Sequence, residues 1–293
     1  MTAAPLPTST FEERLKHALI PGRCYIRYRA LKEWRRGEQE VRLLPQLVDR
    51  RRNAVDVGAN KGTYTYFLAR LARQVYAFEP NPKMYAVLRR TIARNVIAYP
   101  TALSDCSGTA SLRVPYGRKG FSNQGSSLSA AKPMENFMPI EVESRRLDEL
   151  GLADIGFIKI DVEGHERAVL SGAAETIARD RPILLVEIEE AHTGEKLAQS
   201  LAWISGLGYD AYFVAGGGLQ PVASLNAADH GYIFNFVFLP REGHNPIVPG
   251  LDPGISFAIA VDGPIKPGHD ELKEAIRSGP NVGFGSRGHF CRK

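Results

Sequence analysis

Two carboxylates and a histidine alternate over residues 161–165, where a buried apolar strand runs into a helix. Asp161 ends the strand, and Glu163 and His165 follow at intervals of two residues. Side chains of these types could orient a hydroxyl group and remove its proton, because histidine titrates near neutral pH. A structural alternative stays open, in which Glu163 and Glu166 only favour the helix N-terminus and His165 is exposed on the surface.

A second candidate site is the turn Asp56-Val57-Gly58-Ala59-Asn60-Lys61-Gly62, which joins a short apolar strand to a helix. Its glycines permit a sharp turn and the close approach of a ligand. The spacing is neither that of a P-loop, whose lysine follows the second glycine, nor the Gly-x-Gly-x-x-Gly of a dinucleotide site. The turn favours a ligand with a positively charged, phosphate-free end, such as S-adenosylmethionine. A tight connection without a ligand is the alternative.

Four predicted strands end in acidic residues, namely Asp56, Glu79, Asp161 and Glu187. Ligands of an open α/β sheet bind outside the carboxyl ends of its strands. Because buried charges are costly, acids along that edge predict a shared polar cleft. Glu79 could accept hydrogen bonds from both ribose hydroxyls of a nucleoside, or else cap the next helix. Asp105 could receive an adenine amino group or form an ordinary turn.

The elements that position these residues alternate between strands and helices, which is typical of parallel βαβ units. We therefore predict an α/β fold with a seven-stranded, mostly parallel, Rossmann-like sheet and helices on both faces. The glycine- and serine-rich residues 115–139 interrupt this alternation of strands and helices. They are expected to form a lid or binding loop, or else a disordered insertion. Strands are expected over residues 54–57, 75–78, 96–102, 109–114, 140–145, 156–161, 183–188, 209–214 and 232–239, and helices over 63–72, 82–95, about 163–179 and 195–205.

Composition divides the chain of 293 residues into three parts. Residues 1–52 form a helical N-terminal extension with 12 Lys+Arg and 6 Asp+Glu, whereas the other 241 residues hold 25 and 26. This basic extension is either an ordinary solvated surface or attracts an anionic partner, such as a membrane surface or an acidic glycan carrier. Residues 53–240 form the predicted catalytic domain. Residues 241–293 contain nine Gly and six Pro and are expected to be largely irregular.

Several classes of protein are disfavoured by the composition. The three scattered cysteines form neither a disulfide framework nor a zinc pattern, which favours a reduced, cytoplasmic protein. The first ten residues lack the basic start and apolar core of a signal peptide. No apolar run approaches the roughly 20 residues of a transmembrane helix. A nucleic-acid partner is not expected, and the oligomeric state is left open.

Six segments, taken in order, resemble the FkbM-type family of S-adenosylmethionine-dependent methyltransferases. The resemblance covers roughly residues 38–240. It implies a class I methyltransferase fold and O-methylation of hydroxyl groups, commonly on sugars or polyketide-type natural products. The segments are Asp56-Val57-Gly58-Ala59-Asn60-Lys61-Gly62, Ala77-Phe78-Glu79-Pro80-Asn81-Pro82, Ala102-Leu103-Ser104-Asp105, Gly125-Ser126-Ser127-Leu128-Ser129, Arg146-Leu147-Asp148-Glu149-Leu150 and Ile158-Lys159-Ile160-Asp161-Val162-Glu163-Gly164-His165-Glu166.

The resemblance and the residue chemistry together predict a role for each candidate. S-adenosylmethionine would be the cofactor, and a small molecule or glycan the methyl acceptor. Proton removal by His165 without a metal is favoured over a cation held by Asp161 with Glu187 or Glu189. The rival from another class is a non-catalytic nucleoside-binding module in a glycan assembly complex. The expected contacts are Asp56, Gly58, Asn60 and Gly62 with the methionine end of the cofactor, Glu79 with its ribose, Asp105 with its adenine, and Asp161, Glu163 and His165 with the acceptor.

Overall fold

Strands β1 (Asn53–Val57) and β8 (Ile155–Ile160) lie side by side at the centre of the main sheet, and every residue in both is buried. A strand covered on both faces needs no alternation of polar and apolar residues, and neither sequence shows one. The computed structural model that gives this fold describes residues 7–8, 10–118, 120–226 and 233–241.

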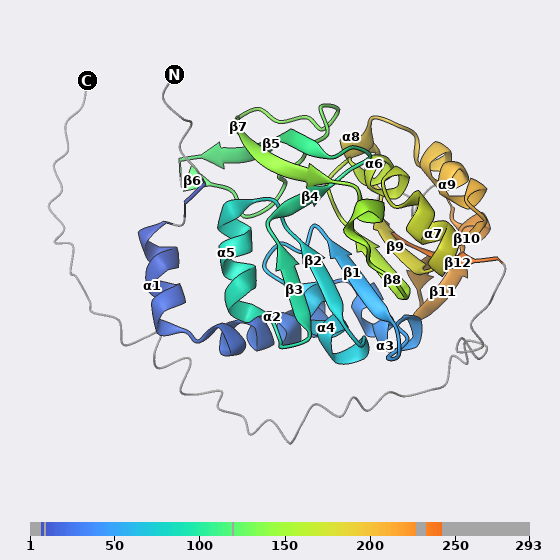
Figure 1. The fold of residues 1–293 in the computed structure, drawn as a ribbon, viewed down its shortest axis with the longest axis horizontal. Coiled ribbons are helices and arrows are strands. Elements are labelled where there is room, and N and C mark those ends of the chain that lie inside the picture. Colours follow the sequence, from blue (N-terminus) through green and yellow to red (C-terminus); the bar gives the residue numbers. More distant parts are fainter. Residues whose placement is uncertain (1–6, 9, 119, 227–232, 242–293) are drawn as a thin grey trace, which may run out of the picture. The chain divides into compact units, whose positions relative to one another are not determined.

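Within the described residues, the main sheet contains eight strands in the order β11-β10-β12-β9-β8-β1-β2-β3 (Figure 1). The five from β9 to β3 pair in parallel, and β12 runs antiparallel to β9 and β10. The predicted mostly parallel sheet is confirmed. The predicted count of seven is wrong, because β11 adds a strand by antiparallel pairing with β10. The remaining bounds are β2 (Val75–Phe78), β3 (Val96–Tyr99), β9 (Ile183–Glu187), β10 (Tyr209–Ala215), β11 (Gly218–Pro221) and β12 (Asn235–Pro240).

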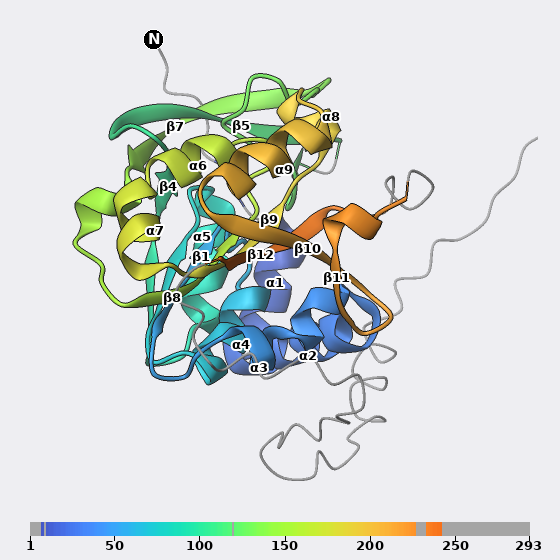
Figure 2. The same cartoon turned by 90° about the vertical axis from the view of Figure 1, so that its right-hand side faces the viewer.

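Helices cover both faces of this sheet, as the sequence predicted (Figure 2). Ala54 and Val55 of β1 point to opposite faces, so Ala54 shares a core with Leu68 and Val55 shares another with Leu201. The helices on the Ala54 face include α3 (Leu44–Leu47), α4 (Thr63–Leu71) and α5 (Pro82–Thr91). Those on the Val55 face include α6 (Glu166–Ser171), α7 (Ala174–Asp180) and α9 (Leu197–Gly206).

A second sheet, which the sequence did not predict, has the strand order β4-β7-β5-β6. It begins where the predicted strand 96–102 is interrupted at Pro100, so that β3 stays in the main sheet and β4 enters the second. The predicted strands 109–114 and 140–145 are present but longer, because they pair antiparallel into the segment expected to be irregular. The bounds are β4 (Thr101–Leu103), β5 (Gly108–Gly117), β6 (Gly120–Phe121) and β7 (Phe137–Arg145).

Other predicted boundaries are corrected by close contacts between segments. The helix expected to run to residue 179 is broken after α6, where Gly172 lies against Ser104: a Cβ on Gly172 would be 1.9 Å from the carbonyl oxygen of Ser104. A short helix, α8 (Glu190–Thr193), precedes α9. The predicted irregular tail of residues 241–293 lies outside the described residues, except for Arg241.

The N-terminal extension is helical, as predicted, with a break at Pro21. Its elements are α1 (Phe11–Leu19), α2 (Gly22–Arg36), the short 3-10 helix η1 (Gln39–Arg42) and α3. Arg52, the last residue of the basic extension, belongs to the fold, because its Nη2 donates 2.6 Å hydrogen bonds to the carbonyl oxygens of Ile155 and Asp180. Among the described residues, no helix is both long and apolar enough to span a bilayer.

Gly58 is required where the ends of β1 and β8 meet. Its φ is +78°, and a Cβ there would lie 1.8 Å from the carbonyl oxygen of Asp161. We expect Gly58→Ala to lower the free energy of unfolding by about 3 kcal/mol or more, because strain at positive φ adds to overpacking. Urea denaturation of the purified protein measures the change.

The matched control is Gly151→Ala, at a φ of +64° with no atom within 4 Å of the added Cβ. This variant has the same kind of backbone strain but no collision, so its free energy of unfolding should fall by only about 1 kcal/mol. Equal losses in the two variants would show that the contact with Asp161 is not what requires Gly58.

Candidate active site

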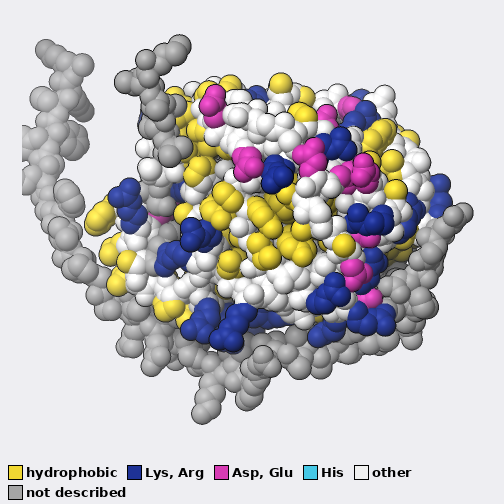
Figure 3. All heavy atoms as spheres, viewed as in Figure 1, with side chains coloured by type: hydrophobic (Ala, Val, Ile, Leu, Met, Phe, Trp, Pro, Cys, Tyr) yellow, Lys and Arg dark blue, Asp and Glu magenta, His cyan; other side chains and the backbone are white. Residues whose placement is uncertain are grey.

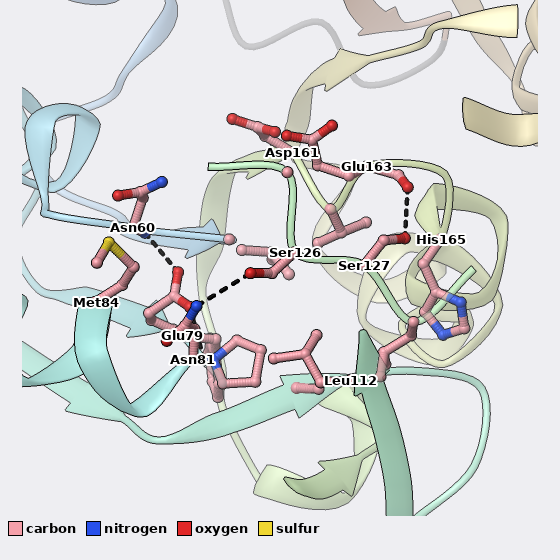
Figure 4. Close-up of a pocket in the computed structure, with 18 of the residues that line it drawn as sticks. Asn60, Glu79, Asn81, Met84, Leu112, Ser126, Ser127, Asp161, Glu163 and His165 are labelled. Carbon is pink, nitrogen blue, oxygen red and sulfur yellow. Dashed lines mark hydrogen bonds between the residues drawn. The ribbon is translucent and has the colours of Figure 1, made fainter. Parts of the chain in front are cut away.

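A cavity of about 330 Å³ lies at the carboxyl ends of β1, β2, β8 and β9, and we call it the strand-end cavity. Its volume falls in the range of roughly 300–1,000 Å³ that is usual for ligand pockets. Asp56, Gly62 and Asp105 do not line it. Six of the nine predicted site residues do: Gly58, Asn60, Glu79, Asp161, Glu163 and His165 (Figure 4).

Glu79 directly follows β2 and is held between two turns of the backbone. Its Oε2 accepts a hydrogen bond of 2.7 Å from the amide of Asn60, and its Oε1 accepts one of 2.8 Å from the amide of Asn81. Burial raises the pKa of Glu79 to about 7, although both amide donors oppose the shift. The carboxylate therefore faces the cavity with further lone pairs available to a donor. Asn81 also caps α5, because its Oδ1 accepts a hydrogen bond from the amide of Lys83.

Asp56 lies in β1, outside the lining of the strand-end cavity. Its side chain is fully buried, Thr65 donates a hydrogen bond of 2.5 Å to its Oδ2, and its Oδ1 has no partner. Burial raises the pKa of Asp56, and the charge of Lys159 opposes the shift. Gly62 begins α4 with a φ of +87° and packs against Leu88, so it shapes the turn from outside the cavity.

Lys159 is the charged residue of the central strand that sequence reasoning missed. It is buried in β8, stands opposite Asp56 in the register, and donates a hydrogen bond of 2.7 Å to Oδ2 of Asp161. Burial alone would lower the pKa of Lys159, but the charges of Asp161 and Asp56 raise it above its usual value. A lysine inside an otherwise apolar strand was the signal that could have found it, because an unpaired buried charge is prohibitive.

Asp161 and Glu187 form a hydrogen-bonded pair of acids at the ends of β8 and β9. Burial acts to raise the pKa of both groups. For Asp161, the charge of Lys159 and the hydrogen bonds with Glu187 and Lys159 together outweigh burial, so its pKa is lowered. For Glu187 the hydrogen bond to Asp161 adds to burial and raises its pKa well above the usual range. Burial and the charge of Asp161 therefore favour the protonated form of Glu187, and the charge of Lys159 favours the ionised form of Asp161 beside the cavity.

Glu163 lies next to Asp161 (Figure 4) and contacts the side chains of Lys132 and His192. Its Oε2 accepts a hydrogen bond from Nζ of Lys132 and lies 3.2 Å from Nδ1 of His192. The same Nδ1 is 3.2 Å from Oε2 of Glu189, so the His192 ring stands between two carboxylates. Sequence reasoning gave His192 no role, because only the fold brings it to Glu163.

His165 lies at the opposite side from this cluster, and its ring points away from the carboxylates of Asp161 and Glu163 (Figure 4). Its Nε2 is 2.9 Å from Oγ of Ser104, and that hydroxyl donates to Oδ1 of the exposed Asp105. Because the hydroxyl proton is used on Asp105, Nε2 of His165 is the donor and Nδ1 the acceptor nitrogen. Burial lowers the pKa of His165, which keeps the ring neutral at pH 7.

Residues 122–129, which we call the cover segment, lie across the cavity and are tied down at three points. Asn60 donates from its side chain to the carbonyl of Asn123 (3.1 Å), Asn81 to Oγ of Ser126 (3.0 Å), and Ser127 to the carbonyl of Glu163 (2.6 Å). Two of these bonds are drawn in Figure 4. Oδ1 of Asn123 is buried without a hydrogen-bond partner. The segment thus connects three predicted site regions and leaves one acceptor free for a ligand.

No group of three or more His, Cys, Asp or Glu side chains suited to hold a metal ion occurs in the described part of the chain. The predicted metal-free activation of a hydroxyl group stays a prediction.

Comparison with known proteins identifies one family and several relatives. The family described as "Methyltransferase FkbM domain" matches residues 56–211. The chain is 28% identical over 228 residues to the 31-O-demethyl-FK506 methyltransferase FkbM of Streptomyces tacrolimicus, covering 67% of this chain and 80% of that protein.

Two further relatives match over shorter stretches. The 2-O-methyltransferase NoeI of Sinorhizobium fredii is 29% identical over 144 residues, which is 43% of this chain and 59% of NoeI. The hexuronic acid methyltransferase AglP of Haloferax volcanii is 32% identical over 150 residues, which is 48% of this chain and 59% of AglP. The chain thus spans less than two thirds of the length of these two relatives.

Lys159→Met should destabilise the protein by about 3–5 kcal/mol near neutral pH, because it leaves buried carboxylates without their cation. Without the ammonium, the folded-state pKa of Asp161 rises above the unfolded value, and that of Asp56, already raised by burial, rises further. The folded state then binds more protons than the unfolded state, so stability falls as pH rises. Urea denaturation of variant and wild type should show a larger loss at pH 8 than at pH 5.

The double variant Lys159→Met/Asp161→Asn removes a carboxylate along with the cation and should recover part of the loss. A loss of the same size at both pH values would contradict the charge network and would leave only the packing of the lysine stem.

Proposed function

Since the chain belongs to the methyltransferase FkbM domain family, we propose that it is an S-adenosylmethionine-dependent O-methyltransferase. The acceptor we propose is a hydroxyl group of a sugar, glycan or natural product. Two relatives carry O-methylation in their names, and a third is named for a hexuronic acid. The observation that carries the proposal is the strand-end cavity, which joins a buried acceptor group, Glu79, to a second acidic cluster around Asp161 and Glu163.

The residues around the cavity fit the proposed cofactor. Oδ1 of Asn123 is a buried acceptor without a partner, and Glu79 presents a carboxylate whose backbone donors hold it in place. We assign Glu79 to the ribose hydroxyls, the Gly58–Asn60 turn to the methionine end, and the side of the cavity lined by His165 to the adenine. Ser104 and Asp105 lie outside the lining and hold the His165 ring through a chain of hydrogen bonds. When bound, S-adenosylmethionine supplies an activated methyl group.

Asp56 and Gly62 act indirectly in this proposal. Asp56 shares Lys159 with Asp161 and so fixes the charge at the floor of the cavity, while Gly62 sets the direction in which α4 leaves the turn. Asp161 keeps its charge and has 31% of its side chain accessible, which lets it attract the cationic end of a ligand. The cover segment would then exclude water from the reacting groups, which strengthens these electrostatic interactions.

Proton removal has two candidates, and we propose His192 in place of the predicted His165. Nδ1 of His192 stands between Glu163 and Glu189, an arrangement that directs the Nδ1 proton to the carboxylates and leaves Nε2 to accept a proton from the acceptor hydroxyl. The two carboxylates would also stabilise the imidazolium that results. His165 has its Nε2 bonded to Ser104, on the side assigned to adenine.

Cofactor affinity should depend on pH through Glu79, and this prediction can be tested without a methyl acceptor. Ribose hydroxyls donate to the ionised carboxylate, so binding favours the ionised form and releases protons. Because burial raises the pKa of Glu79 to about 7, affinity for the cofactor should increase roughly tenfold between pH 6 and pH 8. Calorimetry with S-adenosylmethionine or its demethylated product, in two buffers of different ionisation enthalpy, measures both affinity and proton release.

Glu79→Gln should bind weakly and lose this pH dependence, while an unchanged melting temperature shows that it is folded. A wild-type affinity that does not vary with pH, with no proton release, would place the ribose elsewhere. Binding of NAD in preference to the sulfonium cofactor would overturn the cofactor assignment itself.

The second prediction separates the two histidines. His192→Ala should lower methyl transfer by roughly 100-fold or more, the usual scale for the loss of a general base, with cofactor affinity unchanged. His165→Ala should mainly weaken cofactor binding. The readout is mass spectrometry of extracted glycans and small molecules from cells with and without the gene, searched for the loss of one methyl group, followed by turnover on the acceptor so found.

The opposite pattern, with turnover lost in His165→Ala and retained in His192→Ala, would restore His165 as the base. Excess EDTA should leave turnover unchanged, and activity that requires added magnesium would refute proton removal without a metal. Cofactor binding without methyl transfer to any acceptor would support the non-catalytic alternative.

A further inference from the structure

Helix α1 turns an apolar stripe to the outside of the protein. Phe11, Leu15 and Leu19 are 82%, 49% and 73% exposed, and Ile20 directly after the helix is 39% exposed. Residues spaced by four lie on one face of a helix, so the three side chains form a continuous row. We call Phe11, Leu15, Leu19 and Ile20 the N-terminal stripe.

The orientation of α1 is fixed by polar contacts of its opposite side. Glu13 forms an ion pair of 3.0 Å with Nζ of Lys83 on α5 and accepts a hydrogen bond of 3.0 Å from Asn123 of the cover segment. Thr10 and Glu13 close a capping box at the helix start. Burial opposes the shift, but these donors and the charge of Lys83 lower the pKa of Glu13 to about 2. The stripe therefore faces outward because Glu13 faces inward.

The surroundings of the stripe are basic. Residues 10–36 contain eight Lys+Arg and three Asp+Glu. Arg23, Arg27, Lys32, Arg35 and Arg36 of α2 are all exposed. Figure 3 shows hydrophobic side chains over α1, at the left of the view, with Lys and Arg side chains beside them. This combination of an outward apolar row with a basic rim is the composition of helices that lie in a membrane interface.

We propose that α1 and α2 form a docking surface for an anionic lipid bilayer, with the N-terminal stripe inserted between headgroups and the basic side chains of α2 on the lipid phosphates. Charge complementarity selects this occupant. A second copy of the chain would bring two basic surfaces together, which like charges oppose. A soluble acidic glycan would leave the apolar row in water, whereas a bilayer removes it from water.

Vesicle co-sedimentation of the full chain tests the proposal. Vesicles of mixed phosphatidylglycerol and phosphatidylcholine should retain the protein, and vesicles of phosphatidylcholine alone should retain far less. Raising the ionic strength from about 0.1 M to about 0.5 M should weaken binding several-fold, because salt screens the attraction between the basic side chains and the phosphates.

The triple variant Phe11→Ser/Leu15→Ser/Leu19→Ser should lose at least about tenfold in vesicle binding, because it removes the inserted area. The charge variant Arg23→Gln/Arg27→Gln should lose less vesicle binding than the triple variant, and mainly at low salt. These exposed positions are outside the cavity, so melting temperature and cofactor affinity should match the wild type in both variants.

Matched controls come from other surfaces. Ile97→Ser/Phe137→Ser removes side chains that are 45% and 38% exposed, and Arg145→Gln/Arg241→Gln removes the same charge as the α2 variant. Neither should change vesicle binding.

Three results would overturn the proposal. The first is an absence of binding to anionic vesicles, or binding that the triple variant and its control share equally. The second is a dimer, seen by analytical ultracentrifugation, that dissociates in the triple variant and so assigns the stripe to self-association. The third is retention by nucleic acid or soluble acidic polysaccharide that exceeds retention by anionic vesicles. None of these results bears on cofactor binding, which is measured separately in each variant.

Discussion

The candidate site depends on one buried cation. Lys159 lies in β8, where every residue is buried, between Asp56 of the neighbouring strand and Asp161 in the lining of the cavity. Burial acts to raise the pKa of both aspartates, because the cost of burying a charge exceeds what ordinary hydrogen bonds return, and the charge of Lys159 opposes that rise. Lys159 lowers the pKa of Asp161 and so favours a negative charge beside the cavity, and that charge raises the pKa of the adjoining Glu187. The remaining polar groups are arranged around that charge.

Backbone geometry completes the site. The close contact of Gly58 with the carbonyl of Asp161 brings the ends of β1 and β8 together, and the turn after Gly58 directs the amide of Asn60 at Glu79. Glu79 is thus positioned by main-chain donors rather than by a flexible side chain, which favours a preorganised acceptor. The glycines that suggested close approach of a ligand are needed first for close approach of two strands, and the same turn can serve both purposes.

The second sheet and the N-terminal helix extend this arrangement outward. Between β6 and β7 the chain crosses the cavity as the cover segment, and Asn123 of that segment bonds to both the Asn60 side chain and Glu13 of α1. A helix that lies outside the methyltransferase domain in sequence therefore contacts the cover of its cavity. The proposed membrane surface and the proposed active site are joined through these few side chains, so docking and closure of the cavity have a physical connection.

The sequence alone determined the parallel sheet, its helices on both faces and the placement of acids at strand ends, because buried strands and glycine turns have local signatures. It also determined that Gly58, Asn60, Glu79 and Asp161 would lie together, since the carboxyl ends of parallel strands share one edge. Only the tertiary structure decided which histidine meets the carboxylates. His165 is close to Asp161 in sequence, yet the turn aims its ring at Ser104, while His192 reaches Glu163 from the end of another strand. The second sheet could not be predicted from the sequence either. It depends on pairing between β5 and β7, which are separated along the chain, and local sequence patterns do not show which strands pair. Local sequence specifies where a side chain enters the edge of a sheet, but the direction in which it points is set by long-range packing.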